Sequence, residues 1–269
     1  MVNFIDIIES TDTYNFHTHT QYCDGHDVMD AFVKEAISLG FKHLGFTPHG
    51  PTKVQSTCNM SPDSVNDYLA EVNRLRQVYG EQINIYAGME VDYIDADEFR
   101  SLNTMSWPLD YRIGSVHFIP SFDNPDEFID IDGRFEKFKA KMKNYFHDDI
   151  ESVVRSFYHQ SMEMIQTGGF DIVGHFDKIG LNASLYCEGI DEQPWYDRLV
   201  MNLFEAIMDY GYIIEINTKS WLMYNRFFPN LKYFGMLKKY NAPVVINSDA
   251  HYPTLLDSGR LEAICLFSH

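Results

Sequence analysis

The chain has 269 residues, of which 45% are hydrophobic and 15% aromatic, and its formal net charge is −18. No run of about 18 apolar residues is present, so we expect no transmembrane helix. The strongly acidic balance argues against binding to nucleic acid or to anionic membranes. The first residues are acidic where a secretory signal would be basic, and the four cysteines form no Cys-x-x-Cys pair. We therefore expect a reduced, cytoplasmic protein.

Predicted strands and helices alternate along the chain. Apolar runs predict strands around 14–20, 43–46, 83–93, 110–118, 170–173, 212–216 and 243–246. Helical spacing of apolar residues predicts helices over 28–39, 61–79, 95–105, 135–145, 149–167, 194–210 and 231–240. The segment 119–134 contains Pro120, Asn124, Pro125 and Gly133, which predict an irregular excursion. About seven strand–helix units favour a closed parallel barrel, although periodicity does not distinguish a regular eight-unit barrel from a distorted seven-unit one.

The sequence His17-Thr18-His19 is the first candidate for a functional site. Residues two apart on a strand project to the same face, so the two imidazoles would converge on one point. Such a pair can present two nitrogen ligands to a divalent metal, but a lone His-x-His is more often a surface feature. The positions of the other histidines decide between these interpretations.

Residues of the metal-ligating types lie at or just after the ends of six predicted strands. They are His17, His19, His49, Glu90, His117, His175, Asp249 and His251. In an α/β barrel these strand ends meet at one rim, which carries the active site. Chance does not explain this placement, so we predict that the residues form one shared metal site.

The predicted set is too large for one metal ion, because a mononuclear catalytic site uses three protein ligands and a water. Two or three ions fit better, and metals about 3.5–4 Å apart need a bridging carboxylate. Glu90 lies inside a predicted strand, where an acid is costly unless it is paired or metal-bound. We therefore predict that Glu90 is the bridge in a two-metal hydrolytic site with a shared hydroxide.

Six motifs in chain order resemble those of the polymerase-and-histidinol-phosphatase (PHP) superfamily. They are His17-Thr18-His19, Pro48-His49, Gly88-Met89-Glu90-Val91-Asp92-Tyr93, Ser115-Val116-His117, Gly174-His175 and Ser248-Asp249-Ala250-His251. Glu-Val-Asp-Tyr followed by Ser-Val-His-Phe resembles the monofunctional histidinol-phosphatase branch in particular. The resemblance covers almost the whole chain and implies a distorted (β/α)7 TIM-like barrel, with residues 1–269 forming a single domain.

The resemblance also implies a centre of two or three divalent ions, which would be zinc, manganese or iron. The ligands of the first metal would be His17, His19, Glu90 and Asp249. Those of the second would be Glu90, His117 and His175, so that Glu90 bridges. Those of the third would be His49, His251 and one residue of the loop after His19. Asp24 and His26 are both available in that loop, and we favour Asp24.

Three divalent ions would bring about +6 against about −3 from their carboxylate ligands, so phosphate could bind although the chain is acidic. Basic residues at the same predicted rim are candidates for substrate binding. They are Lys178, Lys219 and Arg226, and a solvated surface position is the alternative for each. Arg112 lies inside a predicted strand and could equally be an internal ion-pair partner.

The resemblance implies a metal-dependent phosphomonoesterase that hydrolyses L-histidinol phosphate in histidine biosynthesis. Hydroxide held between two metals would attack phosphorus, and Asp249, His251 or metal-bound water would protonate the leaving alkoxide. The candidate catalytic side chains are thus Asp249 and His251.

Two alternatives to this activity remain open. A PHP-type phosphoesterase acting on nucleotide monophosphates or other small phosphate esters would use the same centre. A polymeric nucleic acid is a poor substrate for a chain of charge −18 without a basic groove. A metal-binding or regulatory protein without catalysis would not need basic residues around the cluster. The sequence does not predict the oligomeric state.

Overall fold

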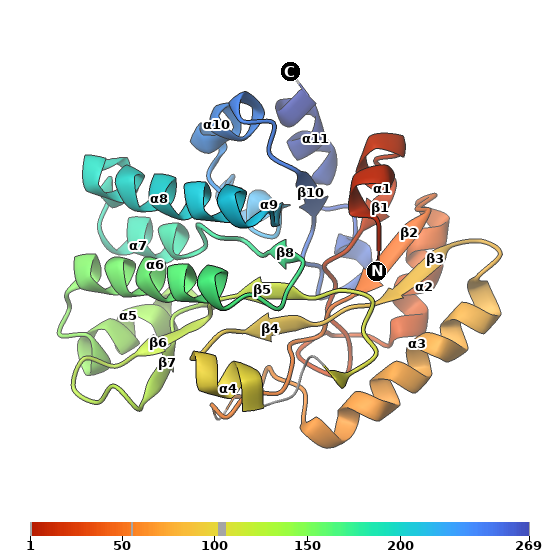
Figure 1. Cartoon of the computed structure of the whole chain (residues 1–269), viewed down its shortest axis with the longest axis horizontal. Helices are drawn as coiled ribbons and strands as arrows, with labels where there is room; N and C mark the ends of the chain where they lie inside the picture. The colour runs from red at the N-terminus through yellow and green to blue at the C-terminus, as the bar shows by residue number, and fades with distance from the viewer. Residues whose placement is uncertain (1, 55, 102–105, 269) are drawn as a thin grey trace.

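Parallel strands form the centre of the molecule, and helices pack around them (Figure 1). The computed structural model describes residues 2–54, 56–101 and 106–268. The strands are β1 (Tyr14–Asn15), β2 (His43–Phe46), β3 (Asn84–Ala87), β4 (Glu90–Asp92), β5 (Ile113–Ser115), β6 (Phe118–Pro120), β7 (Phe128–Asp130), β8 (Ile172–Val173), β9 (Ile213–Asn217) and β10 (Val244–Asn247).

The helices lie outside the strands, with α2 and α3 on one side and α5 to α8 on the other (Figure 1). They are α1 (Phe4–Ser10), α2 (Met29–Ser38), α3 (Val65–Tyr79), α4 (Ala96–Ser101), α5 (Phe135–Tyr145), α6 (Ile150–Thr167), α7 (Ile179–Tyr186), α8 (Pro194–Tyr210), α9 (Trp221–Tyr224), α10 (Phe234–Lys239) and α11 (Arg260–Ser268). Short 3-10 turns are η1 (Pro62–Ser64), η3 (Ile190–Glu192), η4 (Leu231–Tyr233) and η5 (Pro253–Leu255).

Two parallel sheets join to make the barrel. One has the order β1-β2-β3 and the other β10-β9-β8-β5-β4. A parallel bridge between Thr18 and Ala250 connects the chain just after β1 to the chain just after β10 at one seam. At the other seam, a parallel bridge connects His49, which follows β2, to Glu90 of β4. Since β4 continues directly from β3, the two count as one strand of the ring, which therefore has seven strand positions. The predicted distorted (β/α)7 barrel is therefore confirmed.

The strand predicted over 83–93 is interrupted at Gly88, between β3 and β4. A Cβ atom at Gly88 would lie 2.5 Å from the ring of Tyr111 and 2.7 Å from the Thr47 methyl group. Only glycine permits this approach of the Tyr111 ring, and after the interruption β4 pairs with β5. Two residues beyond Gly88, the Glu90 carboxylate faces His17 and His175 at the rim.

Several other predicted boundaries were wrong. The strand predicted over 110–118 divides into β5 and β6, and β6 pairs with β7 in an antiparallel hairpin inside the segment 119–134. Asn124 and Pro125 do form the predicted break, since they make its turn, but Ile119 and Ile129 pair across it. Helices α1, α7, α9 and α11 were not predicted, because each is short or weakly amphipathic. Residues 102–105 of the helix predicted over 95–105 lie outside the described residues.

A small apolar cluster fills the ring beneath the rim. It consists of Phe4, Tyr14, Phe16, Tyr111, Ile113, Ile172 and Val245. Alternation along the strands sets polar residues above these apolar ones, as in the series Ile113, Ser115 and His117. The barrel interior is thus apolar at its base and polar at the rim.

The Tyr111→Phe variant is expected to have a free energy of unfolding about 1–3 kcal/mol lower than that of the wild type. Tyr111 is fully buried, and its hydroxyl donates a 2.6 Å hydrogen bond to the carbonyl of Phe16. Urea denaturation measures the difference, with Tyr210→Phe as the control because Tyr210 is 55% exposed. A change below about 0.5 kcal/mol, typical of surface substitutions, would show that this hydrogen bond does not stabilise the ring.

Two composition-based expectations concern the whole chain. No helix within the described ranges combines the length and the apolar character needed to cross a bilayer. All four cysteines lie in the described part of the chain, and all are free thiols.

Candidate metal centre

The structure brings together all of the predicted ligands at the carboxyl-terminal rim of the barrel. They are His17, His19, Asp24, His49, Glu90, His117, His175, Asp249 and His251. Most are fully or almost fully buried, and only Asp24 and His251 are partly exposed. Since they come from strands spread over the whole chain, the fold itself assembles the cluster.

Glu90 lies at the middle of the cluster, where five imidazoles surround its carboxylate. Its Oε2 atom lies 3.2 Å from His17 Nε2, 3.4 Å from His19 Nε2 and 3.2 Å from His49 Nδ1. Its Oε1 atom lies 2.9 Å from His175 Nε2 and 3.6 Å from His117 Nε2. Both carboxylate oxygens therefore face histidine nitrogens, as a bridging ligand requires.

The ligand-type atoms fall into overlapping groups in which all atoms lie within 4.8 Å of one another. The groups that correspond to the predicted metals are His17–His19–Glu90, Glu90–His117–His175 and His19–Asp24–His49–His251. Asp249 forms a further group with His17 and His175, and its Oδ1 atom lies 3.0 Å from His19 Nε2. The group Glu90–His117–His175 agrees with the ligands predicted for the second metal. His19 belongs to two groups, the one that corresponds to the first metal and the one that corresponds to the third.

The loop after His19 directs Asp24, and not His26, toward the cluster. Asp24 carboxylate oxygens lie 3.5 Å from His19 Nδ1 and 3.4 Å from His251 Nε2. His26 instead stacks on Tyr252, with ring centroids 4.3 Å apart. This geometry favours Asp24 as the loop ligand.

Several polar atoms of the cluster are buried without a hydrogen-bond partner. They are His17 Nε2, His19 Nε2, His49 Nδ1, Asp24 Oδ1 and Glu90 Oε2. Leaving one buried polar group unpaired costs on the order of 1–3 kcal/mol, so a group of them needs an explanation. Imidazole and carboxylate donors around common points are the ligands that Zn²⁺ and similar divalent ions take, and the residues therefore fit such ions.

Neighbouring charges divide the buried groups of the cluster into ionised and neutral ones. Burial raises the pKa of Glu90, but the imidazoles of His17 and His49 outweigh burial and hold that pKa well below its usual range. Burial, with the nearby Lys178 ammonium, lowers the pKa of His175 to about 4. Glu90 is thus an anion and His175 a neutral imidazole at pH 7, which are the states that bind metal.

Two buried carboxylates that sequence reasoning missed hold the histidines in place. Glu215 Oε1 lies 2.7 Å from His17 Nδ1, and Asp92 Oδ1 accepts a hydrogen bond from His117 Nδ1. Asp92 also lies 3.8 Å from His49 Nδ1. The available signals were the second acid of Glu-Val-Asp and a lone acid in the apolar strand β9.

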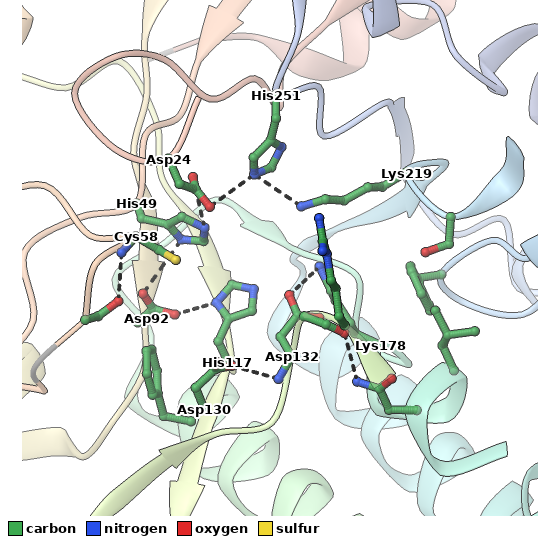
Figure 2. A pocket seen from close by; sticks show the side chains of 18 of the residues that line it. Asp24, His49, Cys58, Asp92, His117, Asp130, Asp132, Lys178, Lys219 and His251 are labelled. Atoms are coloured by element: carbon green, nitrogen blue, oxygen red, sulfur yellow. Dashed lines mark hydrogen bonds and ion pairs between the residues drawn. The ribbon is translucent and has the colours of Figure 1, made fainter. Parts of the chain in front are cut away.

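A cavity of about 460 Å³ opens beside the cluster (Figure 2). Asp24, His49, His117 and His251 line it on the cluster side. The other walls come from the loop before η1, the β7–α5 loop, α7, α9 and Phe228. A small molecule in this cavity would therefore lie against the candidate metal ligands.

Two of the three predicted basic residues line the cavity. Lys178 Nζ lies 3.1 Å from Asp132 (Figure 2). It also lies 3.7 Å from Asp249, and Lys219 Nζ lies 3.2 Å from Asp249. Their positive charges face the cluster from the rim. Lys219 Nζ also lies 3.3 Å from His251 Nε2.

The structure does not bring Arg226 into this cavity, contrary to the prediction. Its guanidinium pairs with Asp191 at 2.7 Å and Asp177 at 3.3 Å, beneath α7. Both carboxylates come from distant parts of the sequence, so the sequence did not reveal them. Arg112 is buried, and its guanidinium donates to the carbonyl of Trp107 at 3.2 Å.

Parallel strands closed into a ring, with histidines and carboxylates at their carboxyl ends, define the class of α/β barrels suited to holding divalent ions. The PHP domain family matches residues 15–219, which is more than half of the chain. The chain therefore belongs to the PHP domain family.

Relatives of the chain are histidinol-phosphatases. The histidinol-phosphatase of Bacillus subtilis is 27% identical over 260 residues, covering 87% of this chain and 92% of that protein. A protein of Schizosaccharomyces pombe named probable histidinol-phosphatase is 28% identical over 255 residues, covering 88% of this chain and 80% of that protein.

Solved structures share the fold. HisK of Listeria monocytogenes superposes with a TM-score of 0.81 at 20% identity, covering 93% of this chain and 99% of that one. Histidinol phosphate phosphatase of Lactococcus lactis, complexed with zinc, L-histidinol and phosphate, has a TM-score of 0.73 at 20% identity. This superposition covers 96% of this chain and 93% of the Lactococcus lactis chain.

Proposed function

We propose that this protein is a metal-dependent phosphomonoesterase that hydrolyses L-histidinol phosphate to L-histidinol and phosphate. The observation that carries the proposal is the buried cluster of imidazoles and carboxylates beside a cavity that also presents Lys178 and Lys219. The histidinol-phosphatases that resemble the chain along most of its length support the choice of substrate. Because the cysteines are free thiols, we also propose that the enzyme works in a reducing compartment such as the cytoplasm.

The residues proposed to hold two or three divalent ions are those of the cluster. They are His17, His19, Asp24, His49, Glu90, His117, His175, Asp249 and His251. Zinc, the ion in the Lactococcus lactis complex, is the first candidate, and manganese and iron are the others. When bound, such ions supply Lewis-acid activation of water and neutralise charge on the phosphoryl group.

The protein's own side chains position the substrate and balance its charge. Lys178 and Lys219 lie beside Asp249, so their ammonium groups would pair with a phosphate placed at the cluster. Asp130 and Asp132 line the same cavity and add negatively charged carboxylates to its wall. That charge suits the organic half of L-histidinol phosphate, which carries a primary amine and an imidazole.

Chelation should abolish turnover of L-histidinol phosphate, and Zn²⁺ or Mn²⁺ should restore it, because the cluster can act only with its ions bound. The experiment measures phosphate release from metal-stripped and reloaded enzyme, together with metal content by mass spectrometry. A panel of other monoesters, including nucleotide monophosphates and aryl phosphates, serves as the comparison. Reloaded enzyme that hydrolyses those esters but ignores L-histidinol phosphate would refute the substrate assignment.

A further inference from the structure

Glu215 is a buried acid that the proposed catalytic machinery does not use. It lies in the middle of β9 between isoleucines, and its side chain has no exposure to solvent. It belongs to none of the groups of candidate metal ligands and does not line the cavity. An ionised side chain in such a place is costly unless it is fully paired.

Hydrogen bonds from four donors occupy the Glu215 carboxylate. Oε1 accepts from His17 Nδ1 at 2.7 Å and from Asn247 Nδ2 at 3.0 Å. Oε2 accepts from the backbone N–H of His175 at 3.0 Å and from Asn217 Nδ2 at 3.1 Å. A carboxylate offers about four acceptor positions, so Glu215 has none left for a metal ion or a substrate.

The partners of Glu215 lead to three of the proposed metal ligands. It contacts the side chain of His17 and the backbone of His175 directly. It reaches Asp249 through Asn217, whose Nδ2 atom also donates to Asp249 Oδ2 at 3.1 Å. One carboxylate at the base of the cluster thus orients ligands that come from three different strand ends.

We infer that Glu215 is a positioning residue that sets the tautomer of His17 and, through it, the affinity of the centre for metal. A proton on Nδ1 of His17 is donated to Glu215, which leaves the Nε2 lone pair free to bind a metal. Nε2 lies 3.2 Å from Glu90 Oε2 and has no hydrogen-bond partner, so it already faces the centre of the cluster. The carboxylate also raises the basicity of the imidazole, so that Nε2 becomes a stronger electron-pair donor to a metal ion. This inference rests on the proposed function, since it requires that the cluster binds divalent ions.

The Glu215→Gln variant tests the inference. An amide group replaces one carboxylate oxygen, so an NH2 group faces two N–H donors and the hydrogen bonds on that side are lost. We expect the apparent dissociation constant for Zn²⁺ to rise about 10–100-fold. Competition with a chromophoric chelator measures this constant, and metal counting after dialysis measures how many ions remain. At saturating Zn²⁺ the KM for L-histidinol phosphate should stay near the wild-type value, because Glu215 does not touch the cavity.

Asp191→Asn is the matched control. Asp191 is also a buried carboxylate that accepts hydrogen bonds, from Arg226 and Asn230, but it contacts none of the proposed ligands. The Asp191→Asn substitution should lower the thermal stability of the protein without changing its affinity for Zn²⁺. If Glu215→Gln does not fold, Glu215→Asp takes its place, because it keeps the charge and shortens the reach to His17.

The outcomes separate the inference from the proposed function. Wild-type Zn²⁺ affinity in the folded Glu215 variant would overturn the role of Glu215 and leave the phosphatase proposal intact. An equal loss of affinity in Asp191→Asn would also overturn it, since any buried carboxylate would then have the same effect. A wild-type protein that retains no divalent ion and releases no phosphate would overturn both proposals.

Discussion

The Glu90→Gln variant is expected to lose more than about 100-fold in turnover and to retain at least one metal ion fewer than the wild type. Glu90 presents both oxygens to histidine nitrogens, at 2.9 Å on one side and 3.2 Å on the other. Glutamine replaces one oxygen with an NH2 group, which cannot bind a metal, and it also removes the negative charge. The loss should exceed the 10–100-fold typical of substitutions outside the ligand set, because Glu90 is the proposed bridge.

The fold should survive this substitution. Glutamine has nearly the volume of glutamate, and the apolar residues at the base of the ring do not depend on the carboxylate. Circular dichroism and thermal unfolding test the fold, while mass spectrometry counts the ions and phosphate release gives the turnover. Glu98→Gln is the control, because Glu98 is also buried but bonds to Thr52 and Lys53 outside the cluster. Full phosphatase activity in pure Glu90→Gln would show that Glu90 is not needed.

The residues of the candidate site were predictable because each follows the end of a strand. Parallel strands in a barrel place those ends at one rim, so the sequence needed only to show strands and ligand types in alternation. His17 and His19 near one end of the sequence and Asp249 and His251 near the other require the first and last strands to be neighbours. The bridge between Thr18 and Ala250 confirms this requirement.

Long amphipathic helices with clear end signals were predicted most accurately. The helices predicted over 135–145 and 194–210 have the bounds of α5 and α8. Pro194 opens α8, and Gly211 ends it with a positive φ of 76°. In α8 the local sequence therefore carries a signal for each boundary.

Contacts between distant segments were not predictable from local pattern. Glu215 contacts His17, which lies 198 residues away, and Arg226 pairs with Asp177 and Asp191 outside the cavity. The interruption at Gly88 depends on Tyr111, whose ring occupies the space of a side chain. These features arise from packing, so the sequence revealed where the ligands lie but not which groups orient them.

The Asp249→Asn variant is expected to lose turnover equally on alkyl and aryl phosphates, by more than about 100-fold on each. Burial raises the pKa of Asp249, but the charges of Lys219 and His17 outweigh burial and hold that pKa well below its usual range. Asp249 is thus an anion at neutral pH, which suits a metal ligand and makes it a poor proton donor. Its φ of 50° is in the left-handed region, which asparagine tolerates, so the substitution changes the charge without straining the backbone.

His251→Asn provides the comparison, because His251 is the other candidate proton donor and lies at the cavity wall beside Lys219. A phenolate with electron-withdrawing groups leaves without a proton, whereas the alkoxide of L-histidinol needs one. The informative quantity is therefore the ratio of kcat/KM for L-histidinol phosphate to kcat/KM for p-nitrophenyl phosphate. We expect this ratio to be unchanged in Asp249→Asn, and a fall in a His251 variant that still holds its ions would identify His251 as the acid. A fall confined to Asp249→Asn would instead identify Asp249 as the acid, and its anionic state in the free protein would then have to change when substrate binds.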